Sequence, residues 1–291
     1  MKKSTSAIII TYNPDLLIVK ANVESLLESR FIKEIIIIDN GSEKKIDEMD
    51  DIPNVTVKYM SSNLGIATAQ NVGLKIAQHN GADFALLLDQ DSEVNCHLVE
   101  KLVHGFNELC NAGYKIAAVG PRPFDLFENK PMNPRVQRDK KISNNLTITR
   151  QIIASGKLID VNVLEHVGLM DDDLFIDGVD HEWCWRAQKF GFKIAIIEDA
   201  IMNHRLGDAR GKFLGMTYKI GSPIRLYYQF RNILVLCRRG YVPLYWKFSN
   251  IIGMILRFII FSTQVEDSDI RRSYMIKGFI AGIKKDKGII R

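Results

Sequence analysis

The sequence lacks several features that mark specialised classes of protein. Its four cysteines are widely spaced and include no Cys-x-x-Cys pair, which argues against a disulfide framework or a zinc site and indicates a reduced, intracellular protein. It shows no internal repeat, no low-complexity segment and no secretory signal, because the basic start leads through a short apolar run into Thr-Tyr-Asn-Pro-Asp. The absence of Gly-x-Gly-x-x-Gly disfavours a dehydrogenase.

The composition is that of a globular protein with an uneven distribution of charge. Of the 291 residues, 46% are apolar and 25% are charged, which suits one large domain or one domain with an appendage. Residues 205–291 contain 17 Lys and Arg against 5 Asp and Glu, whereas residues 1–204 contain 22 against 29. An acidic body with a basic tail predicts two different surfaces, and the tail could meet nucleic acid, an anionic membrane or a phosphorylated substrate.

Short apolar runs alternate with helical patterns over the first 120 residues, which predicts an α/β fold with a mostly parallel sheet flanked by helices. The runs cover residues 6–13, 34–42, 54–62, 83–91 and 115–121, and the helical patterns cover residues 16–30, 63–78 and 97–112. The pattern is lost over 122–150, where we expect a long loop, and helices are expected near residues 222–238, 243–263 and 268–283.

Each of the first four runs ends in a polar cluster, and such strand ends meet at the rim where α/β proteins bind ligands. Asp89 and Asp91 follow a buried run directly, so their like charges need a positive partner. Carboxylates at this spacing suit Mg²⁺ or Mn²⁺ that carries a diphosphate. The alternative is that they only cap the following helix.

Two further strand ends offer polar groups for a nucleotide. Asp39 follows four isoleucines and could accept a hydrogen bond from a nucleoside hydroxyl, or it could be a simple turn residue. Asn63, Gly65 and Asn71 lie at a strand-to-helix junction, where a glycine allows close approach and a helix N-terminus favours anions. Packing is an equal explanation for the glycine.

A second acidic cluster lies near residue 180 and is followed by two tryptophans. Asp180 is the candidate general base, and the tryptophans could offer an aromatic surface to a sugar ring. The alternative is a helix start stabilised by acidic residues, with both tryptophans buried. His204 follows the next predicted strand and could return to the same rim as a third metal ligand. The cluster comprises Asp177, Asp180, Glu182, Trp183 and Trp185.

In this order, the motifs resemble those of inverting nucleotide-sugar glycosyltransferases of family 2, which have the GT-A fold. The resemblance covers about residues 5–235 and, around Asp89 and Asp180, is greatest to bacterial rhamnosyltransferases of O-antigen and capsule assembly. Its motifs are TYN at 11–13, Asp39, NLGIATAQNVG at 63–73, DQD at 89–91, ASG at 154–156, FIDGVDHEW at 175–183, YYQFRN at 227–232 and His204.

The resemblance implies a role for each matching position. Asp39 would contact the nucleoside, Asp91 and Asp89 the metal, and His204 would complete the metal site. Asp180 would deprotonate the acceptor hydroxyl, with Asp177 and Glu182 as its neighbours and rivals. Further donor contacts would be Thr11, Tyr12, Asn13, Asn63, Gly65, Asn71, Gln90 and Arg231, and acceptor contacts would be Ser155, Gly156, Trp183 and Trp185.

The implied reaction is a single displacement that inverts the anomeric carbon of the donor. The metal, aided by Arg225 or Arg231, would stabilise the departing nucleoside diphosphate. The resemblance implies dTDP-L-rhamnose as donor and a lipid-linked saccharide as acceptor. It also implies a catalytic region at 1–220, with a nucleotide-sugar half at about 1–120 and an acceptor half at about 121–220, and a helical region at 221–291.

The basic tail contains an apolar segment that is expected to form a helix in the membrane interface. Lys247, Asn250, Met254 and Arg257 fall in one narrow sector, while the uninterrupted apolar run 251–256 is too short to span a bilayer. The enzyme would then be cytoplasmic and peripheral on the inner membrane face. The alternatives are a helix that packs on the catalytic domain and an interface in a homodimer.

Two other functions fit parts of the pattern. A sugar nucleotidyltransferase shares the fold class and the metal carboxylates, but it would carry a Gly-rich basic loop after the first strand, which TYNPDLL lacks. A non-catalytic module that binds nucleotide sugars would need no base at Asp180. Nucleic-acid binding is disfavoured because the body is acidic and no recognition motif is present.

Overall fold

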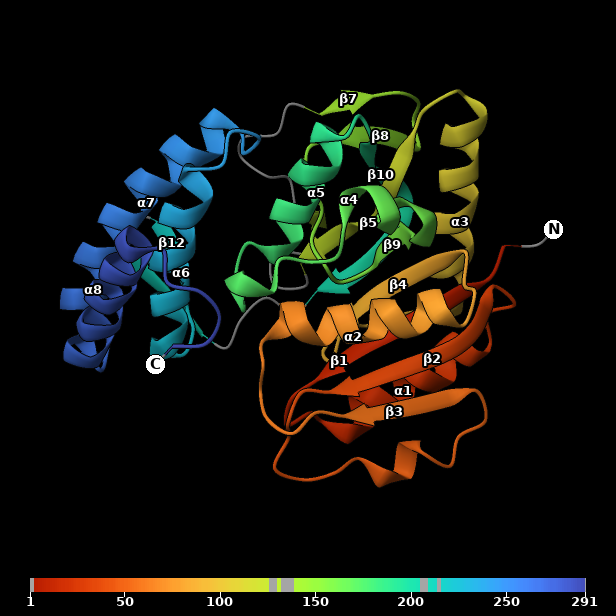
Figure 1. The fold of residues 1–291 in the computed structure, drawn as a ribbon, viewed down its shortest axis with the longest axis horizontal. Coiled ribbons are helices and arrows are strands. Elements are labelled where there is room, and N and C mark those ends of the chain that lie inside the picture. Colours follow the sequence, from red (N-terminus) through yellow and green to blue (C-terminus); the bar gives the residue numbers. More distant parts are fainter. Residues whose placement is uncertain (1–2, 126–129, 132–138, 205–208, 214–215, 291) are drawn as a thin grey trace.

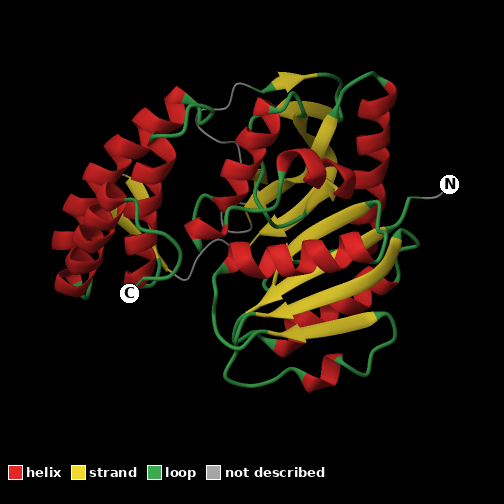
Figure 2. Cartoon of the chain, viewed as in Figure 1, coloured by secondary structure: helices red, strands yellow, loops and turns green. Residues whose placement is uncertain are grey.

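A computed structural model describes residues 3–125, 130–131, 139–204, 209–213 and 216–290. One large sheet runs through the body of the molecule, and the helices of the C-terminal region gather at one side of it (Figures 1 and 2). The strand order is β3-β2-β1-β4-β9-β5-β10-β8-β7, with β6 paired to β5. The strands are β1 Thr5–Thr11, β2 Ile32–Asp39, β3 Val55–Tyr59, β4 Phe84–Asp89, β5 Ile116–Asp125, β6 Lys130–Pro131, β7 Lys140–Lys141, β8 Leu146–Thr149, β9 Lys157–Asp160 and β10 Lys193–His204.

The central strands are continuously apolar because both of their faces are covered. Successive side chains of a strand point to opposite faces of the sheet. Ile8 and Ile10 of β1 therefore pack in one core with helix α2 (Ile66–His79), whereas Ile9 packs in the other core with α1 (Leu16–Leu27) and α3 (Cys96–Asn111). The predicted α/β fold is confirmed, and each predicted apolar run contains a strand.

The sheet is mixed, which differs from the mostly parallel sheet that the sequence predicts. Strands β3, β2, β1 and β4 are parallel, and so are β5 and β10. Strand β9 is inserted between β4 and β5 and runs antiparallel to both. This strand is only four residues long, so no hydrophobic period distinguishes it from a loop in the sequence.

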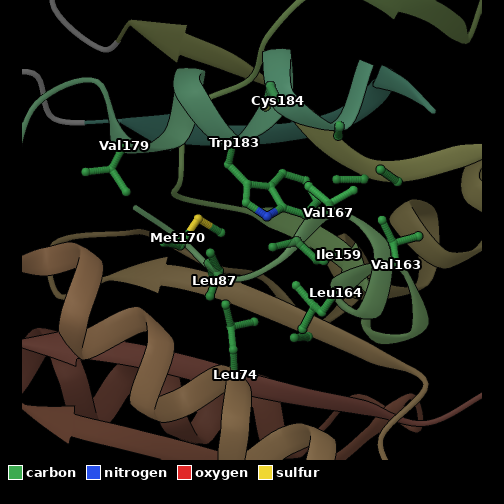
Figure 3. Packing of buried hydrophobic residues seen from close by; sticks show 14 of the residues in the cluster. Leu74, Leu87, Ile159, Val163, Leu164, Val167, Met170, Val179, Trp183 and Cys184 are labelled. Carbon is green, nitrogen blue, oxygen red and sulfur yellow. The ribbon is translucent and has the colours of Figure 1, made fainter. Parts of the chain in front are cut away.

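Helix α5 (Val179–Lys189) covers the same face of the sheet as α2. Its Trp183 and Cys184 side chains pack against Leu87 of β4 and Ile159 of β9 in one continuous core (Figure 3). The short elements before α5 are β9 and η2 (Val161–Val163), α4 (Leu164–Val167) and η3 (Asp172–Leu174), and a further η1 lies at Asp47–Met49.

The predicted C-terminal helices are confirmed as α6 (Pro223–Cys237), α7 (Leu244–Thr263) and α8 (Ser268–Lys284). They follow a ribbon of β11 (Ala209–Phe213) and β12 (Met216–Ile220) and share a small core of their own. Helices α6 and α8 approach closely because α8 carries Gly278, where a Cβ would lie 2.3 Å from the backbone oxygen of Tyr227.

Candidate active site

A cavity of about 600 Å³ lies where the first four strands end. The structure brings the four predicted strand-end clusters together there, since each contributes at least one lining residue. The start of α5 and one residue of α6 close the opposite side. The polar lining residues are Thr11, Tyr12, Asn40, Asn63, Gln70, Asp89, Gln90, Asp91, Asp177, Asp180, His181 and Arg225.

A tight turn presents Asp89, Gln90 and Asp91 to this cavity. The buried Ser92 closes the turn, because its N–H donates to the Asp89 carbonyl (3.1 Å) and its Oγ accepts the Asp89 N–H (3.1 Å). The Gln90 side chain accepts the Tyr12 N–H at 2.7 Å. The ends of β1 and β4 are therefore joined, and Asp91 is left exposed at the tip of the turn.

Negative charge is crowded around Asp89. Removal from water and the neighbouring Asp91 and Asp180 carboxylates raise the pKa of Asp89 to about 7, although Arg225 and Lys157 oppose this. The two cations present therefore do not neutralise the three carboxylates. A divalent cation with oxygen ligands at Asp89 and Asp91 would supply the missing charge, so this donor set fits Mg²⁺ or Mn²⁺.

The third metal ligand implied by the resemblance, His204, ends strand β10 and pairs with Asp125 in β5. Its side chain lies outside the described residues. Within the described ranges, no group of three or more His, Cys, Asp or Glu side chains could hold a metal ion. The metal assignment thus rests on Asp89 and Asp91, and the role of His204 stays a prediction.

Asp180 lies in the first turn of α5 and faces the same cavity. Burial by itself would raise the pKa of this carboxyl group. The charges of His181 and Lys157 and the His181 N–H bond at 2.9 Å outweigh burial, and the pKa of Asp180 falls below its ordinary value. Asp180 is therefore ionised at neutral pH and able to accept a proton.

Glu182 does not share the cavity with Asp180, which contradicts its candidacy as a rival base. It is fully buried and pairs with Arg186 at 2.9 Å and Arg239 at 3.0 Å, while Tyr241 donates to it at 2.5 Å. Residues two apart on a helix point in different directions, so Asp180 and Glu182 cannot both face one ligand. Glu182 instead holds α5 to the segment that follows α6.

The two tryptophans of α5 are also buried, so the expected aromatic surface for a sugar is wrong. The indole N–H of Trp183 donates to the Gly168 carbonyl at 2.9 Å, and that of Trp185 donates to the Gln151 side chain at 2.8 Å. The large apolar ring of Trp183 fills the core under the site (Figure 3), and Trp185 belongs to the same core.

The loop 173–178, which starts within η3 and ends just before α5, is held in an unusual conformation. Phe175 and Asp177 have positive φ angles of 63° and 64°, which residues other than glycine rarely adopt. Asn232 of α6 donates to three backbone carbonyls of this loop at 2.7–2.9 Å. The strain is sustained because α6 fixes the loop, as is common at functional sites.

Arg231 and Arg225 of α6 have different roles. Arg231 is fully buried and donates to the carbonyls of Asp173 at 3.0 Å and Leu174 at 2.8 Å, so its expected contact with the donor is wrong. Arg225 lines the cavity and is fixed by the Asp177 carboxylate, with its closest contact at 2.7 Å. Asp177 thus positions an arginine at the site.

Other expected contacts are occupied within the protein. Asp39 is buried, accepts from Thr11 at 3.2 Å and from the Ser42 N–H at 2.9 Å, and does not line the cavity. Asn71 exchanges two hydrogen bonds with the Met170 backbone, at 2.8 and 2.9 Å. Asn13 does not line the cavity either, and its side-chain oxygen accepts the Glu43 N–H at 2.9 Å.

The two small residues expected to contact the acceptor are packing residues. Ser155 is buried and shares a hydrogen bond with Ser92 beneath the turn at 89–92. Gly156 has a φ of 80°, and a Cβ there would lie 2.6 Å from Pro121. Gly65 does line the cavity, and its missing side chain makes room for Phe175.

Sequence reasoning did not assign four polar residues at the site. Asn40 bonds Asn63 at 3.1 Å and reaches the cavity where Asp39 does not. Gln70 and His181 also line it, and the Gln70 side-chain oxygen is buried without a partner among the described residues. Lys157 is fully buried and donates to the Asp180 carbonyl at 3.0 Å. The sequence signal that could have indicated Lys157 is its place directly before the apolar residues of a short strand.

Asp89→Asn should stabilise the metal-free protein more at about pH 8 than at about pH 5. The folded-state pKa of Asp89 is raised, so its contribution to stability is full below about pH 4 and is lost as the pH rises through about 7. Asparagine removes the buried charge that forms at high pH. We expect Tm at pH 8 to rise by about 2–4 °C for each kcal/mol by which the substitution increases the free energy of unfolding. Calorimetry in EDTA at both pH values measures the change in Tm. An equal change at pH 5 and pH 8 would contradict the crowding of negative charge around Asp89.

Comparisons with known proteins agree with this geometry. Residues 6–168 match the model of the family described as "Glycosyl transferase family 2". The chain is 31% identical over 99% of its length, and 97% of the relative's, to a dTDP-rhamnosyl transferase, RfbF, of Shigella flexneri.

Two solved structures share the fold at low sequence identity. GalNAc-T7 with UDP, GalNAc and Mn²⁺ is 16% identical with a TM-score of 0.63, and the match covers 97% of this chain but only 56% of that one. TarS 1–349 of S. aureus with UDP-GlcNAc is 17% identical with a TM-score of 0.58, covering 96% and 81%. The fold is GT-A, and the chain belongs to glycosyl transferase family 2, whose members transfer a sugar from a nucleotide-sugar donor.

Proposed function

We propose that this glycosyltransferase transfers L-rhamnose from dTDP-L-rhamnose, with inversion and with a divalent metal, to a hydroxyl of a lipid-linked saccharide during the synthesis of a cell-surface polysaccharide. The main observation in support is that the Asp89–Asp91 turn and Asp180 line the same cavity. The full-length likeness to the dTDP-rhamnosyl transferase supports the donor. Family membership decides against the nucleotidyltransferase alternative.

The metal would be Mg²⁺ or Mn²⁺, held by Asp91 and Asp89 and completed by His204. When bound, it would neutralise charge that develops on the leaving diphosphate. The raised pKa of Asp89 supports a cation at this place, and one of the GT-A structures was solved with Mn²⁺. Arg225 adds a second positive group, which Asp177 aims at the cavity.

The nucleoside would lie toward the ends of β1, β2 and β3. Thr11, Tyr12, Asn40, Asn63 and Gly65 line that part of the cavity, and the Gln90 side chain ties it to the metal turn. These groups are hydrogen-bonding but uncharged, which suits a base and a ribose-like sugar. Asp39 would act indirectly, by fixing Thr11.

Asp180 would be the general base. Its lowered pKa keeps the carboxylate ionised, and Lys157 and His181 hold it at the cavity. The acceptor hydroxyl would pass its proton to Asp180 while its oxygen attacks the anomeric carbon and the nucleoside diphosphate leaves. The sugar would be inverted, and no enzyme nucleophile takes part.

The catalytic region would comprise residues 1–220 and the membrane-binding region residues 221–291. Helix α7 exposes one apolar face, and the spacing of its residues by three or four places them in one stripe. Leu244, Phe248, Ile252, Ile255 and Ile259 are each at least half exposed. Among the described helices, α7 alone is long and apolar enough to cross a membrane by length and composition.

A membrane surface, rather than a crossing, fits this helix best. The opposite face of α7 carries Asn250 and Arg257 and faces a cavity against α6, so the helix is part of the bundle. The sequence estimate from the run 251–256 understated the apolar length, since an 18-residue stretch of helix α7 has a mean hydropathy of 1.4. The surrounding basic residues, with 17 Lys and Arg in 205–291, suit anionic head groups.

Asp180→Asn should lower kcat by about 10²–10⁴-fold while donor and metal binding persist, because the amide keeps the shape but loses basicity. Glu182→Gln is the matched control: it should reduce stability through lost ion pairs with Arg186 and Arg239, with kcat per folded molecule close to normal. Steady-state kinetics with thermal melts separate the two. Normal kcat in Asp180→Asn would refute the assignment.

The double variant Ile252→Asp, Ile255→Asp should abolish binding to vesicles that contain about 30% anionic lipid, because two charges enter the apolar stripe. Leu17→Asp on α1 is the control, since Leu17 is 79% exposed on the catalytic body. Flotation assays measure the bound fraction. The membrane assignment would be contradicted if the wild-type chain did not bind the vesicles but formed a dimer that the double variant disrupts. The apolar stripe would then be an interface with a second copy of the chain.

A further inference from the structure

A second, smaller cavity of about 190 Å³ lies between the start of α5 and helices α6 and α7. It shares Asp177, Gly178 and His181 with the active-site cavity, so the two spaces meet at the loop that leads into Asp180. Its other walls come from the C-terminal helices. They are Gln229, Asn232, Ile233, Leu236, Trp246, Asn250 and Arg257.

Arg257 projects into this cavity from the inner face of α7. No residue in the described part of the chain forms a hydrogen bond or ion pair with it, whereas Arg225, Arg231 and Arg239 nearby all have partners. Removal from water lowers the pKa of Arg257, and only the Asp177 carboxylate favours its charge. Arg257 is only partly exposed, and a guanidinium that loses water without gaining a hydrogen-bond partner is unfavourable, so a bound anion would compensate it.

The remaining walls suit a sugar. Trp246 lines the cavity and is steadied by edge contact with Trp185, at a ring-centre distance of 5.1 Å. An aromatic ring beside polar groups is a common platform for a carbohydrate, because it meets the apolar face of the sugar while hydrogen bonds meet the hydroxyls. Gln229 and Asn250 provide such groups.

We propose that this second cavity binds the acceptor sugar and that Arg257 pairs with an oxyanion, a phosphate or a carboxylate, that the acceptor carries near the hydroxyl to be modified. The assignment rests on the proposed function, since it deepens the acceptor side of the same reaction. An acceptor bound here would reach Asp180 at the place where the two cavities meet, which is lined by His181. The C-terminal helices then select the acceptor as well as binding the membrane.

The test measures sugar binding to the full chain by calorimetry in EDTA, without donor or metal. The probes are glucose 1-phosphate, glucuronate and the neutral methyl glucoside. Wild type should bind at least one anionic probe about tenfold more tightly than methyl glucoside. Arg257→Gln should remove that preference and leave methyl glucoside unchanged, while Arg257→Lys should keep part of it.

Arg272→Gln is the matched control, because Arg272 is exposed on α8 and pairs only with Asp269 among the described residues. It should retain the full preference. A preference for glucose 1-phosphate alone identifies a phosphate-bearing acceptor, and one for glucuronate alone identifies a sugar acid.

Two results would overturn the proposal: no anion preference in wild type, or a preference that survives Arg257→Gln and is lost in Arg225→Gln. The second result would place the anion in the active-site cavity. Because no donor is used, either result leaves the rhamnosyl assignment standing. A wrong donor assignment would equally leave this measurement unaffected.

Discussion

The site depends on an excess of negative charge in a confined space. Asp89, Asp91, Asp180 and Arg225 line one cavity, and the buried Lys157 donates to the Asp180 carbonyl. Burial and the neighbouring Asp91 and Asp180 carboxylates raise the pKa of Asp89, and these two cations do not offset them. A protein interior does not sustain such an excess without a partner. The proposed reaction would supply one, because a divalent cation would enter together with the sugar-nucleotide diphosphate.

The arrangement of these charges depends in turn on helix α6. Arg231 and Asn232 hold the carbonyls of loop 173–178, and Asp177 on that loop holds Arg225. The loop is strained at Phe175 and Asp177, so without α6 it would relax and Asp180 would lose its position. Helix α6 therefore positions groups of the candidate site, in addition to any role of the C-terminal helices at a membrane.

Much of this could be predicted from the sequence because strand period and strand-end chemistry are local signals. The four clusters after the first four apolar runs do meet, and Asp89, Asp91 and Asp180 share a cavity. The errors concern the direction of side chains. Glu182, Trp183, Trp185 and Arg231 lie beside site residues in sequence but point into the core, which depends on helix packing. Strand β9 and the buried Lys157 depend on long-range pairing in the same way.

The central claim is that the carboxylate turn binds the donor only through a cation. The most direct measurement is the Tm of the wild-type chain with dTDP-L-rhamnose, with UDP-glucose as comparison, in Mn²⁺ and in EDTA. At about 100 times Kd, a ligand of the native state adds about 2.7 kcal/mol, which is a clear shift. The account predicts a rise in Tm with dTDP-L-rhamnose in Mn²⁺ and none in EDTA. An equal rise in EDTA would contradict it.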